Sequence, residues 1–415
     1  MYMIYVGIDI SKYKHDCFIC KDTGEVIVEN LSFTNNKKGF QQFLDLLKPY
    51  DNSNVRIGLE ATGHYGLNLK LFLEKNNYSF MEFNPLLVKE FYKSLSLRKT
   101  KTDKVDAVVI TQKLMSVPYK PNSKLFYHKY SIKSLTRLRE TLVKQRSKYK
   151  VQLTNILDII FPEFKPFFSN SFGITSLYIL NKYKTPDKIA NMRDFETLNK
   201  LSRGNFTYAK FVKLKDLAKN TIGESNDIFE IQLSSILNLY KNIDDHIIEL
   251  DKQISTIIKD LNPPTLSIPG IGVISCASII SEFGDISRFS NSAKMLSFAG
   301  LEPGIIESGT MSSKGKMVKR GSGYLRYSLM NVSLTVIRYN NIFYDYYYKK
   351  ISEGKCHRVA LSHVCKKLIR VIYILETKNI QFDPSILNYN INFKNFKKYS
   401  FWSLLAWDSF PFYFF

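Results

Sequence analysis

The chain has 415 residues, of which 45% are hydrophobic and 23% are charged. These are the proportions of a globular protein, and they exclude a mainly disordered chain. Its 59 Lys and Arg residues outnumber 37 Asp and Glu residues, which gives a formal net charge of +22. Such an excess favours a polyanionic partner, most often nucleic acid, because neutralised phosphates release counterions. The alternative is a soluble protein that is simply rich in lysine.

Several protein classes are not expected. Five cysteines in 415 residues do not make a disulfide framework, and the CxxC of Cys17 and Cys20 is interpreted as strand packing. The N-terminal apolar run is interrupted by Asp9 and does not predict a signal peptide. No apolar stretch of about 18 residues predicts a membrane span. We therefore expect a cytoplasmic protein with reduced thiols and no membrane partner.

The first part of the chain alternates predicted strands and helices. Asp22-Thr23-Gly24 is typical of a hairpin turn between two strands, and the spacing of Phe40, Phe43 and Leu47 indicates a helix with one apolar face. Strands are expected at 3–9, 16–20, 25–33, 55–60 and 78–84, and helices at 36–48, 64–75 and from about 102 to 116. This order predicts a mixed sheet with helices on its faces.

The middle of the chain is predicted to be helical. Residues 120–150 are basic, with leucines at helical spacing, and 160–225 read as short helices interrupted by prolines. A heptad pattern indicates a coiled coil between subunits or a long helical hairpin, and a single bundle helix is the alternative. The pattern consists of Phe229, Leu233, Ile236, Tyr240, Ile243, Ile247, Leu250, Ile254, Ile257 and Leu261.

Glycine becomes frequent after Pro263. A helix is expected from about 324 to 338, and a further basic helical stretch is expected to end near Lys378. Residues 385–415 look poorly structured and end in FWSLLAWDSFPFYFF. This aromatic tail is too short for a membrane span, and the sequence assigns it no role.

Four carboxylates are candidates for a metal site. Asp9 and Glu60 each end a predicted buried strand, where a carboxylate is costly unless it is solvated, paired or metal-bound. Asp103 and Asp106 lie three residues apart at a helix start and share one face. A hard divalent cation would relieve their mutual repulsion and serve phosphoryl displacement. A helix cap for Asp103 and a favourable first-turn charge for Asp106 are the alternatives.

These residues carry a resemblance to a known family. The motifs GID at 7–9, LEATGHYG at 59–66, NP at 84–85 and KTDKVDA at 101–107 resemble the DEDD transposases of bacterial insertion sequences (the insertion sequence 110 family). The resemblance implies a ribonuclease H-like domain similar to the Holliday-junction resolvase RuvC. It also implies that Asp9, Glu60, Asp103 and Asp106 bind Mg²⁺.

A second group of motifs lies in the C-terminal part. Pro-Gly-x-Gly at 269–272 opens a predicted helix and resembles half of a helix-hairpin-helix, whose turn amides at Gly270 and Gly272 can hold a phosphate. Residues 311–330 read as a basic loop loosened by glycines, with Lys314, Lys316, Lys319, Arg320 and Arg326 as candidate phosphate contacts. Ser308 precedes this loop, and by spacing alone it reads as a turn serine.

The family resemblance extends to this part and changes the interpretation of Ser308. PGIG, AGLEP, ESG and the downstream K-x-G-x-x-x-LR pattern resemble the C-terminal domain of the same transposases. There the serine of the SG pair is the nucleophile, so the role is carried to Ser308, with Ser312 and Ser313 as rivals. The family also implies DNA as donor and target, a structured non-coding guide RNA, and a bacterial cytoplasmic location.

The expected organisation combines an α/β part with all-α parts. We expect a RuvC-like DEDD domain at 1–120, a helical or coiled-coil region at 121–262, a mainly helical C-terminal transposase domain at 263–384, and an aromatic tail at 385–415. A homo-oligomer, dimer or tetramer, is expected from the heptad helices. Further candidate nucleic-acid contacts are Lys99, Lys101, Arg137 and Arg139, for which a solvated basic helix face is the alternative.

Two other functions remain open from the sequence. One is a Mg²⁺-dependent, structure-specific nuclease that uses metal-activated water, with Ser308 uninvolved. The other is a non-catalytic RNA- or DNA-binding protein with a vestigial acidic site. The sequence specifies neither the target and donor sites, nor the guide RNA sequence, nor the number of subunits, nor whether this copy is active.

Overall fold

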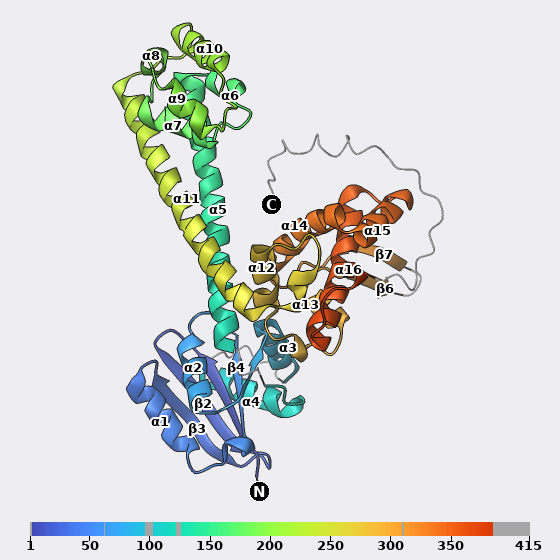
Figure 1. Cartoon of the computed structure of the whole chain (residues 1–415). Helices are drawn as coiled ribbons and strands as arrows, with labels where there is room; N and C mark the ends of the chain where they lie inside the picture. Colours follow the sequence, from blue (N-terminus) through green and yellow to red (C-terminus); the bar gives the residue numbers. More distant parts are fainter. Residues whose placement is uncertain (1, 62, 96–102, 122–125, 309–310, 385–415) are drawn as a thin grey trace.

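A computed structural model describes residues 2–384 apart from 62, 96–102, 122–125 and 309–310; the side chains of 103, 126–129, 305–308 and 311–316 also lie outside the description. The predicted aromatic tail at 385–415 is therefore not described. The described chain contains a sheet body (residues 3–119), a long helical arm (126–261) and a C-terminal body (263–384) (Figure 1).

The sheet body is built on five strands in the order β3-β2-β1-β4-β5. Strand β2 is antiparallel to both β1 and β3, whereas β4 is parallel to both β1 and β5. The strands are β1 (Ile4–Ile10), β2 (Lys14–Lys21), β3 (Val26–Thr34), β4 (Val55–Glu60) and β5 (Phe80–Phe83). This mixed sheet confirms the predicted fold class, a ribonuclease H-like domain followed by helices.

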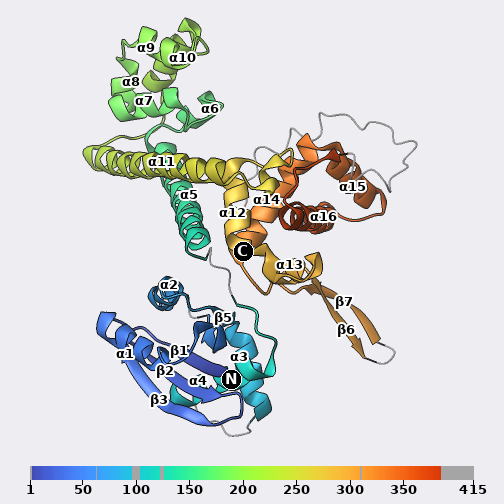
Figure 2. The same cartoon turned by 60° about the horizontal axis from the view of Figure 1, so that its bottom comes forward.

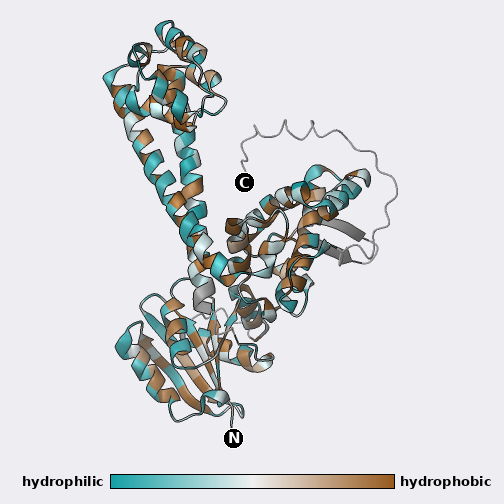
Figure 3. Cartoon of the chain, in the orientation of Figure 1, coloured by the Kyte–Doolittle hydropathy of each residue, from teal (hydrophilic) through white to brown (hydrophobic). Residues whose placement is uncertain are grey.

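Helices cover both faces of the sheet, as the alternation of side chains along β1 requires. Ile4, Val6, Ile8 and Ile10 belong to one buried cluster with α1 (Lys37–Leu47) and α2 (Leu67–Lys75). Tyr5 belongs to another, with α3 (Pro85–Leu95) and α4 (Asp103–Ser116). The sheet is consequently apolar along its strands (Figure 3). Helix α3 lies outside the predicted elements, which end a strand at 84 and begin the next helix at about 102.

The helical arm consists of two 35-residue helices, α5 (Phe126–Ile160) and α11 (Asp227–Leu261), which pack side by side (Figure 1). They run antiparallel, because Arg139 pairs with Asp251 and Arg146 with Asp244. The short helices expected at 160–225 are present at the tip of the arm. They are α6 (Phe164–Phe167), α7 (Ile174–Lys182), α8 (Pro186–Ala190), α9 (Phe195–Leu201) and α10 (Tyr208–Lys219).

The heptad pattern of α11 faces α5 of the same chain, so one of the predicted alternatives, the helical hairpin, describes this chain. One row of the pattern is buried as expected: Leu233, Tyr240, Ile247 and Ile254. The second row that faces α5 is Leu237, Asp244, Asp251 and Ile258, and the predicted Ile236, Ile243, Leu250 and Ile257 lie half-buried beside it. Its two central aspartates pair with α5 arginines, which removes the cost of placing carboxylates in the seam.

The C-terminal body is mainly helical and has its own core. It contains α12 (Val273–Phe283), α13 (Ser292–Ala299), α14 (Gly323–Tyr339), α15 (Asn341–Ser352) and α16 (His357–Lys378), with short 3-10 turns at Pro264–Ser267 and Ile286–Arg288. A smaller cluster of Ile132, Ile254, Ile258 and Ala277 joins α12 to the base of the helical arm.

The prediction of a basic loop at 311–330 is wrong over the first part of this segment. Strands β6 (Pro303–Ser308) and β7 (Met311–Met317) form an antiparallel hairpin, and α14 already begins at Gly323. Pairing with β6 satisfies the backbone of a segment whose serines, lysines and glycine carry a weak strand signal. None of the helices in the described part of the chain combines the length and apolar character needed to cross a bilayer.

Candidate active site

Asp9 and Glu60 end two adjacent parallel strands of the sheet. Strand β1 pairs with β4 in a register that places Ile8 beside Leu59, so the next residues, Asp9 and Glu60, follow at the same edge. Both side chains are half-buried. They lie two residues beyond Gly7 and Gly58, and therefore project from the same face of the sheet as those glycines.

That face is covered by α4, which approaches β1 closely at Gly7. A Cβ atom on Gly7 would lie 2.2 Å from Thr111 Oγ1 and 2.5 Å from the carbonyl oxygen of Ala107. Such contacts are impossible, so only glycine allows the helix to sit this close. The glycine of the GID motif thus sets the distance between α4 and the strand that carries Asp9.

The N-terminus of α4 lies at the edge where Asp9 and Glu60 end. Gly7 meets Ala107 and Thr111, whereas Met115, further along α4, contacts Cys20, the β2 partner of Tyr5 toward the start of β1. Helical spacing places Asp103 and Asp106 on the same stripe as Ala107 and Ile110, one turn nearer the N-terminus. The backbone therefore brings the four predicted positions into one region, with the positive end of the helix dipole beside them.

The donor types in this region fit a hard divalent cation. Carboxylate oxygens are the ligands that Mg²⁺ and Ca²⁺ prefer. Among the side chains that the structure describes, which exclude that of Asp103, no group of three or more His, Cys, Asp or Glu forms a metal-binding cluster. The arrangement of the backbone fits a cation, while the described side chains alone do not form its complete ligand set.

Asp16 is a carboxylate that sequence reasoning missed. The β1–β2 register pairs Asp9 with Asp16, so Asp16, Asp9 and Glu60 follow one another across three strands. Asp16 is 3% exposed, and Lys14 Nζ lies 3.1 Å from its Oδ2. Like charges opposite one another on a sheet repel, and Lys14 offsets part of that repulsion. The signal was available in the short connection at residues 11–13, which joins β1 to β2 and determines this register.

Ser308 ends β6 and pairs with Met311 across the hairpin. Gly309 and Thr310 connect the two strands and lie outside the described residues, as does the Ser308 side chain. Figure 2 shows the hairpin projecting away from the C-terminal body, and in both views it lies apart from the sheet body (Figures 1 and 2). Within one chain, the structure brings the four carboxylate positions together but does not bring Ser308 to them.

The predicted nucleic-acid contacts fall into three groups. Lys99 and Lys101 lie outside the described residues, and only the backbone of Lys314 and Lys316 is described, on β7. Lys319 and Arg320 are exposed. The others contact protein: Arg326 donates to the carbonyls of Ala299 and Gly321, Arg137 pairs with Glu282, and Arg139 with Asp251.

The predicted phosphate-binding turn also has protein contacts. Gly270 has a φ of +96°, and a Cβ there would lie 2.8 Å from Val336 Cα of α14. Thr335 Oγ1 donates to the Gly270 carbonyl at 2.7 Å. Gly272, which caps α12, is exposed, and no atom lies within 4 Å of where its Cβ would be. Of the two glycines, only Gly272 offers open backbone to a ligand.

Comparison with known proteins agrees with this geometry. Residues 6–162 match the DEDD transposase family of insertion sequence IS110, and residues 265–348 match the transposase family IS116/IS110/IS902. Together the two matches span more than half of the chain. The chain belongs to the IS110 family of transposases. It is a DNA transposase or recombinase, and the family resemblance stated from the sequence is confirmed.

Relatives align with this transposase over nearly its whole length. The pilin gene-inverting protein of Moraxella bovis is 25% identical over 388 residues, covering 92% of this chain and 98% of the relative. An insertion element IS116 protein of Streptomyces clavuligerus is 22% identical over 393 residues, covering 92% and 96%. The alignments include the helical arm, which neither family match covers completely.

Proposed function

We propose that this transposase cuts and rejoins DNA at a site composed of its four carboxylates and Ser308. The observation that carries the proposal is the convergence of Asp9, Glu60 and the N-terminus of α4 at one edge of the sheet. The family matches cover this edge and the Ser308 hairpin. We further propose the domain limits 1–120, 121–262 and 263–384; α4 ends at Ser116, α11 at Leu261 and α16 at Lys378.

Asp9, Glu60, Asp103 and Asp106 would hold Mg²⁺ through carboxylate oxygens. When bound, the cation supplies charge stabilisation at a phosphodiester undergoing displacement. The protein's part is to hold the carboxylates close together: Asp103 and Asp106 lie within one turn of α4, and Asp9 and Glu60 lie on adjacent strands. Gly7 contributes by allowing α4 to lie directly against β1.

Ser308 would act as the nucleophile. Its Oγ forms a bond to phosphorus while one P–O bond of the DNA backbone breaks, the serine hydroxyl gives up its proton, and the displaced sugar oxygen takes one up. A sugar hydroxyl of another strand then attacks the phosphoserine and releases the serine. The number of phosphate ester bonds is unchanged, so no ATP is required.

The separation of the hairpin from the sheet body favours a site shared between subunits. If the hairpin of one copy reaches the carboxylates of another, the expected homo-oligomer is a requirement for catalysis. Mixing a Ser308→Ala protein with an Asp9→Asn protein tests this directly. A shared site predicts that the mixture recovers part of the activity that each variant lacks, whereas a site within one chain predicts no recovery.

The covalent link separates the proposal from its alternatives. The wild type should form an SDS-stable protein–DNA adduct that Ser308→Ala lacks. A plain nuclease would form no adduct and would keep cutting after this substitution. A non-catalytic binding protein would be unaffected by Asp9→Asn combined with Glu60→Gln, a change that should abolish recombination by this transposase.

We also propose that an element-encoded structured RNA guides the reaction. The support is the family resemblance together with the net charge of +22 and the exposed cations Lys319 and Arg320. The test is recombination of purified protein with and without RNA transcribed from the DNA flanking the gene. Activity that requires this RNA supports guidance, and full activity of RNA-free protein contradicts it.

A further inference from the structure

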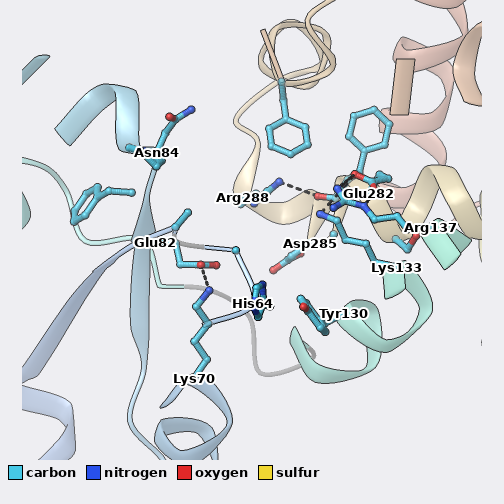
Figure 4. A pocket seen from close by; sticks show the side chains of 18 residues that line it. His64, Lys70, Glu82, Asn84, Tyr130, Lys133, Arg137, Glu282, Asp285 and Arg288 are labelled. Atoms are coloured by element: carbon cyan, nitrogen blue, oxygen red, sulfur yellow. Dashed lines mark hydrogen bonds and ion pairs between the residues drawn. The ribbon is translucent and has the colours of Figure 1, made fainter. Parts of the chain in front are cut away.

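A cavity of about 720 Å³ separates the sheet body from the C-terminal body. Its walls come from three parts of the chain: residues 61–85 of the sheet body, the first turns of α5, and the segment from the end of α12 to Phe298 (Figure 4). This volume is in the range of small-ligand pockets. It therefore admits one or two nucleotide units of a strand rather than the full width of a duplex.

The cavity lies beside the carboxylates. Ala61, which directly follows Glu60, lines it, and so does Phe83, the register partner of Glu60 on β5. The cavity thus opens at the carboxyl ends of β4 and β5, the edge at which ligands bind in sheets of this kind. A strand lying in it would pass beside the backbone that directly follows Glu60.

One ionic cluster of the cavity has a structural role. Glu282 is 2% exposed and accepts hydrogen bonds from Arg137 Nε at 2.6 Å, Arg137 Nη2 at 3.1 Å and Ser322 Oγ at 2.7 Å. Burial acts to raise the pKa of Glu282, but these hydrogen bonds and the charge of Lys133 hold that pKa below its ordinary value. This cluster joins α5, α12 and the N-cap of α14, and its cations already have a buried carboxylate.

A second cluster has a different arrangement, because it brings a lysine of the sheet body and an arginine of the C-terminal body to the same cavity, and Arg288 donates there to a backbone carbonyl, that of Phe283 at 3.0 Å. Glu82 on β5 accepts from Lys70 of α2, whose side chain is 5% exposed. Across the cavity, Arg288 lies over the rings of Phe298 and Phe289 at 4.6 and 4.7 Å. Burial lowers the pKa of Arg288, and the charges of Glu82 and Asp285 oppose that shift.

These cations are placed for a ligand of opposite charge. Lys70 and Arg288 project from opposite walls of a cavity that adjoins the predicted cleavage site (Figure 4). A phosphodiester carries one negative charge and several acceptor oxygens, as Glu82 does, and a guanidinium binds such groups through paired hydrogen bonds. Ion pairs removed from water contribute little net stability. A contribution to folding is therefore a weak explanation for the Lys70–Glu82 pair.

We propose that this cavity binds the backbone of a DNA strand leading to the carboxylates, with Lys70 and Arg288 as phosphate contacts. Glu82 occupies the phosphate position beside Lys70 in the free protein and releases this lysine when DNA enters. The inference rests on the DNA transposase function of the family. Binding in this cavity requires neither Ser308 nor bound metal. The binding proposal can therefore fail while the proposed chemistry holds, and the chemistry can fail while the binding proposal holds.

The test is equilibrium binding of full-length protein to a linear DNA duplex with a single-stranded overhang at several salt concentrations, with Asp9→Asn present throughout to prevent cleavage. Glu82→Gln should bind more tightly and raise the slope of log affinity against log salt by about one, since one more cation neutralises phosphate. The ratio of its DNA affinity to that of the protein with Glu82 should therefore fall about threefold between 50 and 200 mM salt. Misfolding cannot produce this gain.

Glu25→Gln is the matched control. Glu25 also accepts from a lysine, Lys21 at 2.8 Å, but lies in the exposed β2–β3 turn. The charge change is identical, so equal gains for both variants would overturn the proposal. Lys70→Gln combined with Arg288→Gln should lower the slope by about two.

Two further results would overturn the proposal. One is a Glu82→Gln protein with unchanged affinity and slope. The other is tighter binding of Glu82→Gln to an RNA duplex of the same sequence without tighter binding to DNA.

Discussion

Replacing Gly7 by alanine tests the link between α4 and the carboxylates most sharply. The added methyl group would lie 2.2 Å from Thr111 Oγ1, 2.5 Å from the Ala107 carbonyl oxygen and 2.6 Å from the Thr111 amide nitrogen. Ordinary contacts of this kind are about 3.5 Å. Because two of the three opposing atoms belong to the backbone, no rotamer change relieves the clash, and α4 must retreat by about 1 Å.

This retreat has two expected costs. Overpacking of this kind destabilises by about 1–3 kcal/mol. The displaced helix also carries Asp103 and Asp106, and a misplacement of about 1 Å costs on the order of 100-fold in catalytic rate. We therefore expect activity to fall far more than stability, together with weaker binding of divalent cation.

The assay compares thermal unfolding, Mn²⁺ affinity and strand transfer for the wild type and Gly7→Ala. Gly323→Ala is the control, because its Cβ would meet nothing closer than Arg326 Nη2 at 3.8 Å. A Gly7→Ala protein with normal melting temperature, metal affinity and activity would refute the close approach of α4.

Three further changes test other parts of the structure. Glu282→Gln should destabilise the protein by about 2 kcal/mol near pH 7. Because the pKa of Glu282 is lowered in the folded protein, the wild type should be the more stable protein above about pH 4.3 and should lose this advantage as the pH falls through the folded pKa. Urea unfolding at several pH values measures this difference. Lys14→Met should cost about 1 kcal/mol by removing the cation beside Asp16, and added Mg²⁺ should reduce that loss in the same assay. Leu237→Ala in the arm should cost about 3 kcal/mol, whereas Leu239→Ala, at 45% exposure, should cost far less. Equal losses for the two leucines, a pH-independent Glu282→Gln difference, or a stable Lys14→Met protein would contradict these expectations.

The order of strands in the sheet body was predictable because its signals are local. Alternating apolar residues and the turn at Asp22-Thr23-Gly24 define β1 to β3, and apolar runs define β4 and β5. Carboxylates at the ends of parallel strands then fall at one edge of the sheet. Placing Asp9 beside Glu60 therefore needed only the strand order and this rule.

Other features depend on partners distant in sequence and could not be predicted. Arg137 and Arg139 read as a basic helix face, but their carboxylate partners lie 145 and 112 residues further along the chain. The β6–β7 hairpin has weak strand propensity, so pairing rather than composition indicates it. Helix α3 was predictable in principle, because proline is favoured at the first helical position and Pro85 begins it.

The most direct test of the proposed mechanism is mass spectrometry of the adduct trapped on DNA. After nuclease and protease digestion, the peptide that spans Ser308 should carry a nucleotide through its hydroxyl oxygen, and Asp9→Asn protein should yield only the unmodified peptide. A nucleotide on another residue, or strand transfer that proceeds without any nucleotide-bearing peptide, would contradict the mechanism.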